Sequence, residues 1–400
     1  MTSLMLNLAY VHDICYVHVI MSTAYFMNIQ RLSSGELEMA LAARLKELLG
    51  GVDWLRGWRL APANNRTDAG FNLRASLPLP GGRKATLYVA CKSELRPAGA
   101  YALMQRRAIL PSERRKLVIP VLALPWVSPR MAELCKENKW CWFDLAGNYS
   151  LDVPGSLHLE HTGNAPVYRR QTPLANLSTR EANRVMRVLL DPKYAQTRWT
   201  QRELQKHCRP EVSLGLINRV VRRLRDEAYI EAHPRGGFWL RDPLKLLFAW
   251  RDVYRFNRHE RRGYFTLLQG KRLRDALAEL GLRTGVSVLY AAFSAAELQA
   301  PHVRQPKTWL YVRDRDIAAF EKVIEARPVD SGENLTVLLP DDEGVLYMCE
   351  ERTAGDGHLG CTSIVQTYVD LWHCGGRGKE AAEALLEQRL KPAWKEQGLL

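Results

Sequence analysis

The sequence predicts an α/β protein built of several domains. Its 400 residues exceed what one hydrophobic core usually organises, so about two to four domains are expected. Apolar strand-like runs alternate with amphipathic helical stretches in the first 170 residues and again after residue 260. An arginine-rich, mostly helical segment with a glycine-tipped hairpin lies between them. We therefore expect an N-terminal extension, 1–32, followed by domains at 33–170, 178–242 and 243–400.

Residues 1–32 are apolar but fit neither an export signal nor a membrane helix. A signal peptide opens with basic residues, whereas no Lys or Arg precedes Arg31. A spanning helix needs about 20 apolar residues in succession, and this run is interrupted by His12, Asp13 and His18. We expect a poorly ordered extension without a functional role, and no membrane partner.

Cysteine usage and charge indicate a reduced, cytoplasmic protein with an anionic partner. The eight cysteines form no C-x-x-C pair, which is typical of reduced cytoplasmic thiols and predicts no metal site and no cofactor. Net charge is +8 over residues 1–177 and +6 over 178–242, but −3 over 260–400. The basic front and middle predict contact with a polyanion. Scattered solvated charge is the alternative explanation.

The first domain, 33–170, follows the element order of an α/β core. Ser33 and Glu36 form a capping box for a helix whose apolar face holds Leu37, Leu41, Leu45 and Leu48. The later patterns predict a strand hairpin around 71–77, a strand at 86–92, a helix near 97–107, a strand at 117–127, a helix capped by Ser128 and a strand around 140–153. A helix, three strands, a helix and a strand is the order of the PD-(D/E)xK nuclease core.

The metal-binding motif of such a core is incomplete in this chain. An active core holds Mg²⁺ with an acid on one strand and an acid-x-Lys triplet on the next. Asp68 fills the first place and Lys92 the last, but Ala90 stands where the second acid belongs. We therefore predict a fold without cleavage chemistry, not an enzyme, with Asp68 and Lys92 forming an ion pair at a strand end. A Mg²⁺-dependent nuclease is the alternative.

The central segment, 178–242, predicts three helices followed by a hairpin. Capping boxes open the first two helices, at Ser178 with Glu181 and at Thr200 with Glu203. Ser213 caps the third helix, whose inward-facing residues are Ile217, Val220, Val221 and Leu224. Strands at 229–230 and 238–240 flank a tight Arg235-Gly236-Gly237 turn. This order is that of a winged helix-turn-helix.

Polar residues of this segment match the chemistry of DNA reading. In DNA-binding winged helices the third helix enters the major groove. Four side chains near its start are candidates for base contacts: Ser213, Asn218, Arg219 and Arg222. Four others are candidates for phosphate or minor-groove contacts: Arg202, Lys206, Arg223 and, at the hairpin tip, Arg235. Four arginines within residues 219–225 exceed what solubility requires. A winged helix that contacts protein is the alternative.

The last domain, 243–400, begins with a basic amphipathic helix and continues as α/β. With the preceding domains it resembles the AbiEi-type antitoxins and regulators of type IV toxin–antitoxin systems, in the variant with a restriction-endonuclease-like front. The matching strings are Leu95-Arg96-Pro97, Val127-Ser128-Pro129-Arg130, Asp144-Leu145-Ala146-Gly147-Asn148, Arg241-Asp242-Pro243, Ala295-Ala296, Leu310-Tyr311-Val312, Gln366 to Leu371 and Arg377-Gly378 with Glu380-Ala381-Ala382. The resemblance spans roughly residues 35–395 and departs at Ala90, where related fronts often keep an acid.

The resemblance implies a DNA-binding autorepressor of its own operon, often paired with a nucleotidyltransferase toxin. The expected partners are operator DNA, a cognate toxin and a second copy of the chain, because one winged helix buries too little DNA surface for tight binding. An antitoxin that acts mainly by protein binding is a further alternative. Within the rear motif, Gln366, Asp370, Arg377 and Glu380 either pair inside one helical hairpin or shape a partner surface.

Overall fold

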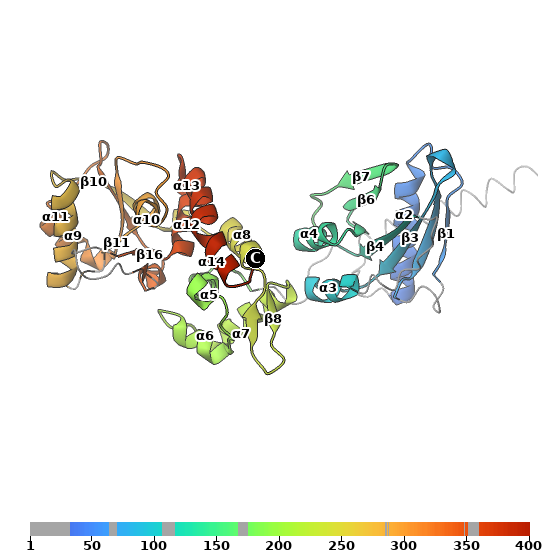
Figure 1. Ribbon diagram of the computed structural model, residues 1–400, viewed down its shortest axis with the longest axis horizontal. Helices are drawn as coiled ribbons and strands as arrows, with labels where there is room; N and C mark the ends of the chain where they lie inside the picture. The colour runs from blue at the N-terminus through green and yellow to red at the C-terminus, as the bar shows by residue number, and fades with distance from the viewer. Residues whose placement is uncertain are drawn as a thin grey trace, which may run out of the picture. The chain divides into compact units, whose positions relative to one another are not determined.

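The computed structural model describes residues 33–63, 70–105, 117–166, 175–284, 286, 288–347, 349–350 and 360–400. The chain divides into two compact units, residues 1–173 and 174–400, each of which is α/β (Figure 1). The predicted α/β class is therefore confirmed. The predicted extension lies outside the described residues, and the boundary expected at 242–243 falls inside the second unit. Every described helix is too short or too polar to cross a membrane.

The first unit is a seven-stranded mixed sheet with helices on both faces (Figure 1). Its strands are adjacent in chain order: β1 (Arg59–Pro62), β2 (Leu73–Pro78), β3 (Lys84–Cys91), β4 (Leu117–Leu124), β5 (Cys141–Asp144), β6 (Tyr149–Val153) and β7 (Leu157–His161). The central strands β3, β4 and β5 run parallel, and the outer pairs are antiparallel. The helices are α2 (Ser34–Gly50), α3 (Pro97–Gln105) and α4 (Pro129–Glu137), with a short turn η2 (Pro80–Gly82).

Helix α2 covers one face of this sheet, and α3 and α4 cover the other. The capping box of Ser33 and Glu36 is present, with the Ser33 amide donating to the Glu36 carboxylate at 2.7 Å. The buried leucines of α2 are Leu37, Leu41, Leu45 and Leu49. The predicted Leu48 is only half-buried, because the four-residue spacing of the stripe continues to Leu49.

The single strand predicted over 140–153 is wrong, because the chain reverses there into the antiparallel pair β5 and β6. The turn depends on Gly147, whose φ of 99° favours glycine. Buried Asp144 fixes the turn, since its carboxylate accepts hydrogen bonds from the Val127 amide (3.0 Å) and the Asn148 amide (2.8 Å). Burial raises the pKa of Asp144 although these bonds lower it. The Asp144–Asn148 string thus has a structural role.

The second unit begins with three helices and a hairpin. Their bounds are α5 (Arg180–Leu190), α6 (Gln201–His207), α7 (Leu214–Asp226), β8 (Ile230–Ala232) and β9 (Phe238–Leu240), with a short turn η4 (Pro192–Tyr194) after α5. The capping box at Thr200 and the cap at Ser213 are confirmed. The capping box predicted at Ser178 is wrong: Thr179 caps α5 instead. Tertiary contacts hold the Ser178 backbone, since Arg258 donates to its carbonyl at 2.8 Å.

The rest of the second unit is a second seven-stranded mixed sheet, of order β13-β10-β14-β12-β11-β16-β15. Its strands are β10 (Glu260–Phe265), β11 (Val288–Tyr290), β12 (Thr308–Val312), β13 (Arg327–Pro328), β14 (Leu335–Leu339), β15 (Cys349–Glu350) and β16 (Cys361–Thr362). Its helices are α8 (Pro243–Val253), α9 (Gly270–Thr284), α10 (Ala292–Gln299), α11 (Ile317–Ile324), α12 (Ile364–His373), α13 (Gly378–Leu385) and α14 (Lys391–Glu396). Short 3₁₀ helices lie at η5 (Phe256–Arg258), η6 (Asp314–Asp316) and η7 (Glu343–Leu346), and η8 (Leu386–Leu390) is a π-helical segment between α13 and α14.

One apolar core joins the three central helices to the rear of the unit. Helices α9 and α11 pack on one face of the sheet around Phe320. The opposite face belongs to a larger cluster that also contains the inner faces of α5, α7, α8, α12 and α13. Trp250 of α8 is fully buried there, and its indole N–H donates to Asn183 of α5 at 2.7 Å. The segment 178–242 therefore shares its core with the rear segment, which has a second core of its own beneath α9 and α11.

Candidate nucleic-acid interface

Helix α7 has one buried and one exposed face. The predicted inward residues Ile217, Val220, Val221 and Leu224 are all 0–1% exposed and anchor the helix in the core. On the other side, three- and four-residue steps align Gly215, Asn218, Arg219 and Arg222, all of them exposed. The sequence therefore builds a helix that is held from behind while its polar face stays open.

The side chains of this open face are largely uncommitted. Arg219 and Arg222 make no hydrogen bond or ion pair with any other residue that the structure describes. Asn218 donates from Nδ2 to Gln201 at a long 3.3 Å. The Ser213 hydroxyl oxygen accepts from the Leu216 amide as the helix cap, which leaves its O–H as a donor. These four predicted residues share one surface.

Arg223 is placed differently from the other predicted residues. It is about one-fifth exposed, and its Nη1 donates to the Ala175 carbonyl at 2.6 Å. Its Nε lies 3.4 Å from Glu227. Arg223 therefore braces α7 against the segment before α5 and is less available for a phosphate than predicted. Arg225, which the sequence analysis did not single out, is the exposed arginine of this turn.

Helix α6 packs beside α7 and adds two exposed cations. Leu204 is fully buried and fixes the inner face of this short helix. Arg202 and Lys206, one turn apart, are exposed and make no hydrogen bond through their side chains to a described residue. The two side chains are therefore exposed on the helix next to α7, and their predicted phosphate contacts stay a prediction.

The hairpin is held beside its turn by a third strand-like segment that local sequence patterns do not indicate. Trp199, between α5 and α6, pairs with Phe238 of β9. The Trp199 amide donates to the Phe238 carbonyl (2.7 Å), and the Trp199 carbonyl accepts from the Phe238 amide (2.9 Å). The exposed Arg235 lies at the tip, beyond the end of β8. On the outer face the Trp239 ring, 39% exposed, makes an edge contact with His233. Trp199 thus fixes the start of β9 and the adjoining Gly237, while Arg235 stays exposed in the turn.

Gly237 is expected to be indispensable for this hairpin. Its φ is 82°, and a Cβ there would lie 2.4 Å from the Trp199 carbonyl oxygen. Gly236 has a similar φ of 84° but open space around it. Gly237→Ala should therefore lower the free energy of unfolding by about 1–3 kcal/mol more than Gly236→Ala, because overpacking adds to the shared backbone strain. Equal midpoints of the two variants in urea would contradict the close approach.

The nuclease-like positions of the first unit do not form a metal site in the described residues. Ala90 of β3 is fully buried in the apolar cluster beneath α3 and α4. Lys92 follows the strand, with its amide bonded to the Ala123 carbonyl at 3.1 Å. Asp68 lies outside the described residues, and so does its predicted ion pair with Lys92. No group of three or more His, Cys, Asp or Glu in the described ranges is placed to hold a metal ion.

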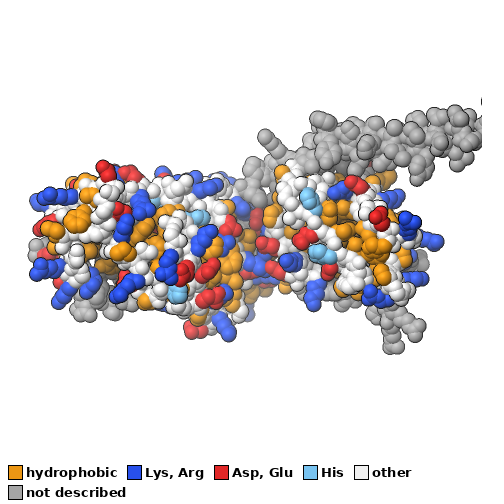
Figure 2. All heavy atoms as spheres, turned by 90° about the horizontal axis from the view of Figure 1, so that it is seen from above, with side chains coloured by type: hydrophobic (Ala, Val, Ile, Leu, Met, Phe, Trp, Pro, Cys, Tyr) orange, Lys and Arg blue, Asp and Glu red, His pale blue; other side chains and the backbone are white. Residues whose placement is uncertain are grey.

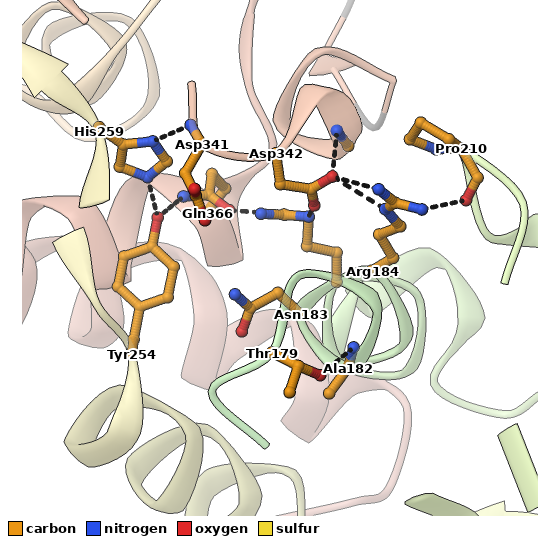
Figure 3. Close-up of polar contacts among 12 residues, drawn as sticks. Thr179, Ala182, Asn183, Arg184, Pro210, Tyr254, His259, Asp341, Asp342 and Gln366 are labelled. Carbon is orange, nitrogen blue, oxygen red and sulfur yellow. Dashed lines mark hydrogen bonds and ion pairs between the residues drawn. The ribbon is translucent and has the colours of Figure 1, made fainter. Parts of the chain in front are cut away.

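A buried polar network lies between the rear sheet and α5, and Figure 3 shows the part of it around Asp342, Gln366 and Tyr254. Its centre is Asp370 of α12, which is fully buried and accepts hydrogen bonds from the hydroxyls of Tyr254 (2.9 Å) and Tyr311 (3.1 Å) and from Gln366 Nε2 (2.7 Å). Burial raises the pKa of Asp370 to about 7 although these donors favour its ionised form.

His259 extends this network toward the end of β14. The Asp341 amide donates to Nδ1 of His259 at 3.0 Å, so in the neutral ring the proton is on Nε2. Nε2 lies 2.8 Å from the Tyr254 hydroxyl and donates to it. Burial lowers the pKa of His259 to about 4, which keeps the ring neutral at pH 7. The hydrogen bonds therefore all donate in one direction, from the Asp341 amide through His259 and the Tyr254 hydroxyl to Asp370.

These contacts exclude a partner surface for Gln366 and Asp370, whereas Arg377 and Glu380 pair with each other but remain exposed. Gln366 and Asp370 pair with each other inside the unit and are 0% exposed, so the interpretation that they shape a partner surface is wrong. Arg377 and Glu380 form an exposed ion pair, with Nε and Oε2 2.8 Å apart, beside the junction of α12 and α13. Pairing within one helical hairpin is confirmed for both pairs. Arg184 and Arg187 of α5 complete the network, and no local sequence pattern indicates either of them.

Comparisons with protein-family models, curated proteins and solved structures found no match to this chain. The surface adds little by itself: basic and acidic side chains are interspersed over the faces that Figure 2 presents. The face of α6 and α7 differs, because its exposed arginines lack acidic partners among the described residues. We take this face, together with the hairpin tip, as the candidate nucleic-acid interface.

Proposed function

We propose that this chain binds duplex DNA sequence-specifically and regulates transcription. Helices α5, α6 and α7, the Trp199 segment and the β8–β9 hairpin follow one another in the order of a winged helix-turn-helix. The observation that carries the proposal is the exposed, unpaired pair Arg219 and Arg222 on the outer face of a helix fixed from behind. An arginine in this setting can grip guanine O6 and N7 with both ends of its guanidinium.

Removing either arginine is expected to weaken binding to a specific site. A binding duplex is first selected from a randomised library, and its affinity is then measured by gel shift. Arg219→Ala or Arg222→Ala should reduce the specific binding free energy by about 1–3 kcal/mol, because each loses a bidentate base contact. Loss of Lys206 should instead weaken selected and scrambled duplexes alike.

Arg377→Ala is the matched control, because it also removes an exposed arginine of the second unit but far along the chain in the rear motif. It should bind like the wild type. If both α7 variants also bind like the wild type, the base contacts assigned to α7 are refuted. If selection enriches no sequence, and footprinting over the chain's own upstream region protects nothing, the regulatory function itself is refuted.

The resemblance to AbiEi-type regulators supports an autorepressor that acts as the antitoxin of a type IV system. A second copy would supply the DNA contact area that one winged helix lacks. The protected region is then expected to contain inverted half-sites about 10 base pairs apart or a multiple of that. An open reading frame for a nucleotidyltransferase next to the gene would support the antitoxin role. We do not favour a nuclease, because buried Ala90 supplies no carboxylate.

A further inference from the structure

Arg184 of α5 makes contacts at both ends of its guanidinium (Figure 3). Nε and Nη2 bond Asp342 Oδ1 at 2.9 and 2.8 Å. Nη1 donates to the main-chain carbonyls of Pro210 (3.4 Å) and Glu211 (3.3 Å). One side chain therefore connects the end of β14, in the rear sheet, to the turn that leads into α7.

Asp342 is a fixed point for this connection. It is 3% exposed, and its carboxylate also accepts from the Gly344 amide (3.1 Å) and from Arg187 Nη1 (2.9 Å). Arg187 beside it and the hydrogen bonds from Arg184 hold the pKa of Asp342 below its usual value despite burial. Gly344 packs so closely that a Cβ would lie 2.6 Å from Asp342 Oδ2. The carboxylate therefore has little freedom to move.

The other end of the connection is the turn that sets where α7 starts. Pro210 and Glu211 precede buried Val212 and the cap Ser213. Helix α6 holds the same turn, since Gln205 Nε2 donates to the Val212 carbonyl at 3.0 Å. Arg184 adds a donor from α5 to the Pro210 and Glu211 carbonyls of this turn. The start of α7 is thus held from two helices.

We infer that Arg184 is a positioning residue for DNA reading: it transmits the position of the rear sheet to the start of α7 and sets sequence discrimination without touching DNA. The inference rests on the proposed function. Base-edge contacts need placement within about 0.5 Å, whereas phosphate contacts tolerate more freedom because they depend mainly on charge. Loosening the turn should therefore reduce specific binding more than non-specific binding.

Arg184→Lys tests this separation. Lysine keeps the charge and reaches Asp342, but its single ammonium group cannot also bond the Pro210 and Glu211 carbonyls as Nη1 of arginine does. We expect affinity for the selected duplex to fall about 3- to 30-fold, while affinity for a scrambled duplex and its salt dependence stay unchanged. Amide hydrogen exchange in 211–216 should become faster. A stably folded variant with wild-type discrimination and wild-type exchange overturns the inference.

Arg180→Lys is the matched control. Arg180 lies one turn earlier on α5 and is more than half exposed, with an ion pair of 2.5 Å to Asp341. No bond from Arg180 to the Pro210–Glu211 turn occurs among the described residues, so discrimination and exchange in 211–216 should match the wild type. An equal loss of discrimination in this variant would mean that any weakening of α5 suffices, which overturns the specific role of Arg184.

A measurement on the wild type keeps the inference testable if Arg184→Lys does not fold. Because coupling between two sites is reciprocal, the selected duplex should slow amide exchange in 342–346, far along the chain from α7, and the scrambled duplex should not. Equal effects of both duplexes overturn the inference. If no duplex is preferred, the proposed function fails, whereas unchanged exchange with intact specific binding shows that only the inferred role of Arg184 is wrong.

Discussion

Replacing Arg187 with methionine is expected to lower the free energy of unfolding of the second unit by about 3–5 kcal/mol. Arg187 is 1% exposed, and its guanidinium donates to Asp342 Oδ2 at 2.9 Å and to Gln366 Oε1 at 2.6 Å. Methionine is long and flexible enough to occupy the space but provides no donor. The variant therefore leaves a buried carboxylate short of one partner and a buried amide oxygen with none, and both groups remain out of water.

Urea denaturation followed through amide exchange in α5 measures this loss on the second unit itself. Arg377→Met is the matched control, since the Arg377–Glu380 pair also has two short contacts but is exposed to solvent. Water screens that pair, so its loss should hardly move the midpoint. Equal, small effects of the two substitutions would mean that the buried network contributes no more than a surface ion pair.

His259→Gln is expected to make the second unit less sensitive to acid. Burial lowers the pKa of His259 from 6.5 to about 4, so between these pH values the unfolded chain binds more protons than the folded one. Stability from this group is therefore present above pH 6.5 and is lost as the pH falls toward 4, by about 3 kcal/mol in total. Glutamine does not titrate, so the variant should lose less stability over that range. Denaturation at several pH values gives the free energy of unfolding against pH for the wild type and the variant. Equal slopes for the two proteins would contradict the role assigned to His259.

Asp370→Asn should change the pH dependence of the free energy of unfolding in the opposite direction. Burial raises the pKa of Asp370 from 3.8 to about 7, so here the folded chain binds the extra proton. The stability that Asp370 contributes is present at low pH and is lost as the pH rises through 7. This partly cancels the effect of His259 in the wild type. Without Asp370 the acid loss due to His259 is uncompensated, and the variant should lose stability more steeply than the wild type between pH 6.5 and 4.

Local signals in the sequence predicted much of the secondary structure. Capping residues such as Thr200 and Ser213 satisfy amides within their own helices, so they can be recognised without tertiary information. Where distant contacts compete, the local signal failed: the Ser178 backbone is bound by Arg258, and α5 starts one residue later. The reversal at Gly147 was missed because apolar residues continue on both sides of it.

The candidate interface could be predicted in part for the same reason. Helical spacing places Asn218, Arg219 and Arg222 opposite the apolar face of α7, and the structure leaves them exposed there. Arg223 belongs to the same cluster in the sequence, but its Ala175 contact spans 48 residues and no local pattern indicates it. The contact of Arg184 with Asp342 spans 158 residues. Only the adjacent acids Asp341 and Asp342 hint at a binding partner for the arginines of α5.

The apolar core that the three central helices share with the rear of the unit has a consequence for how such a chain can evolve. A cut after residue 242 would expose the surface of α5 against which Trp250 packs. It would also leave Arg187 without Asp342, its ion-pair partner. Helices α5, α6 and α7 therefore cannot be exchanged between proteins as a self-sufficient domain. Under the proposed function, a new DNA target would be gained either by transfer of residues 175–400 as a block or by changes to single exposed side chains of α7.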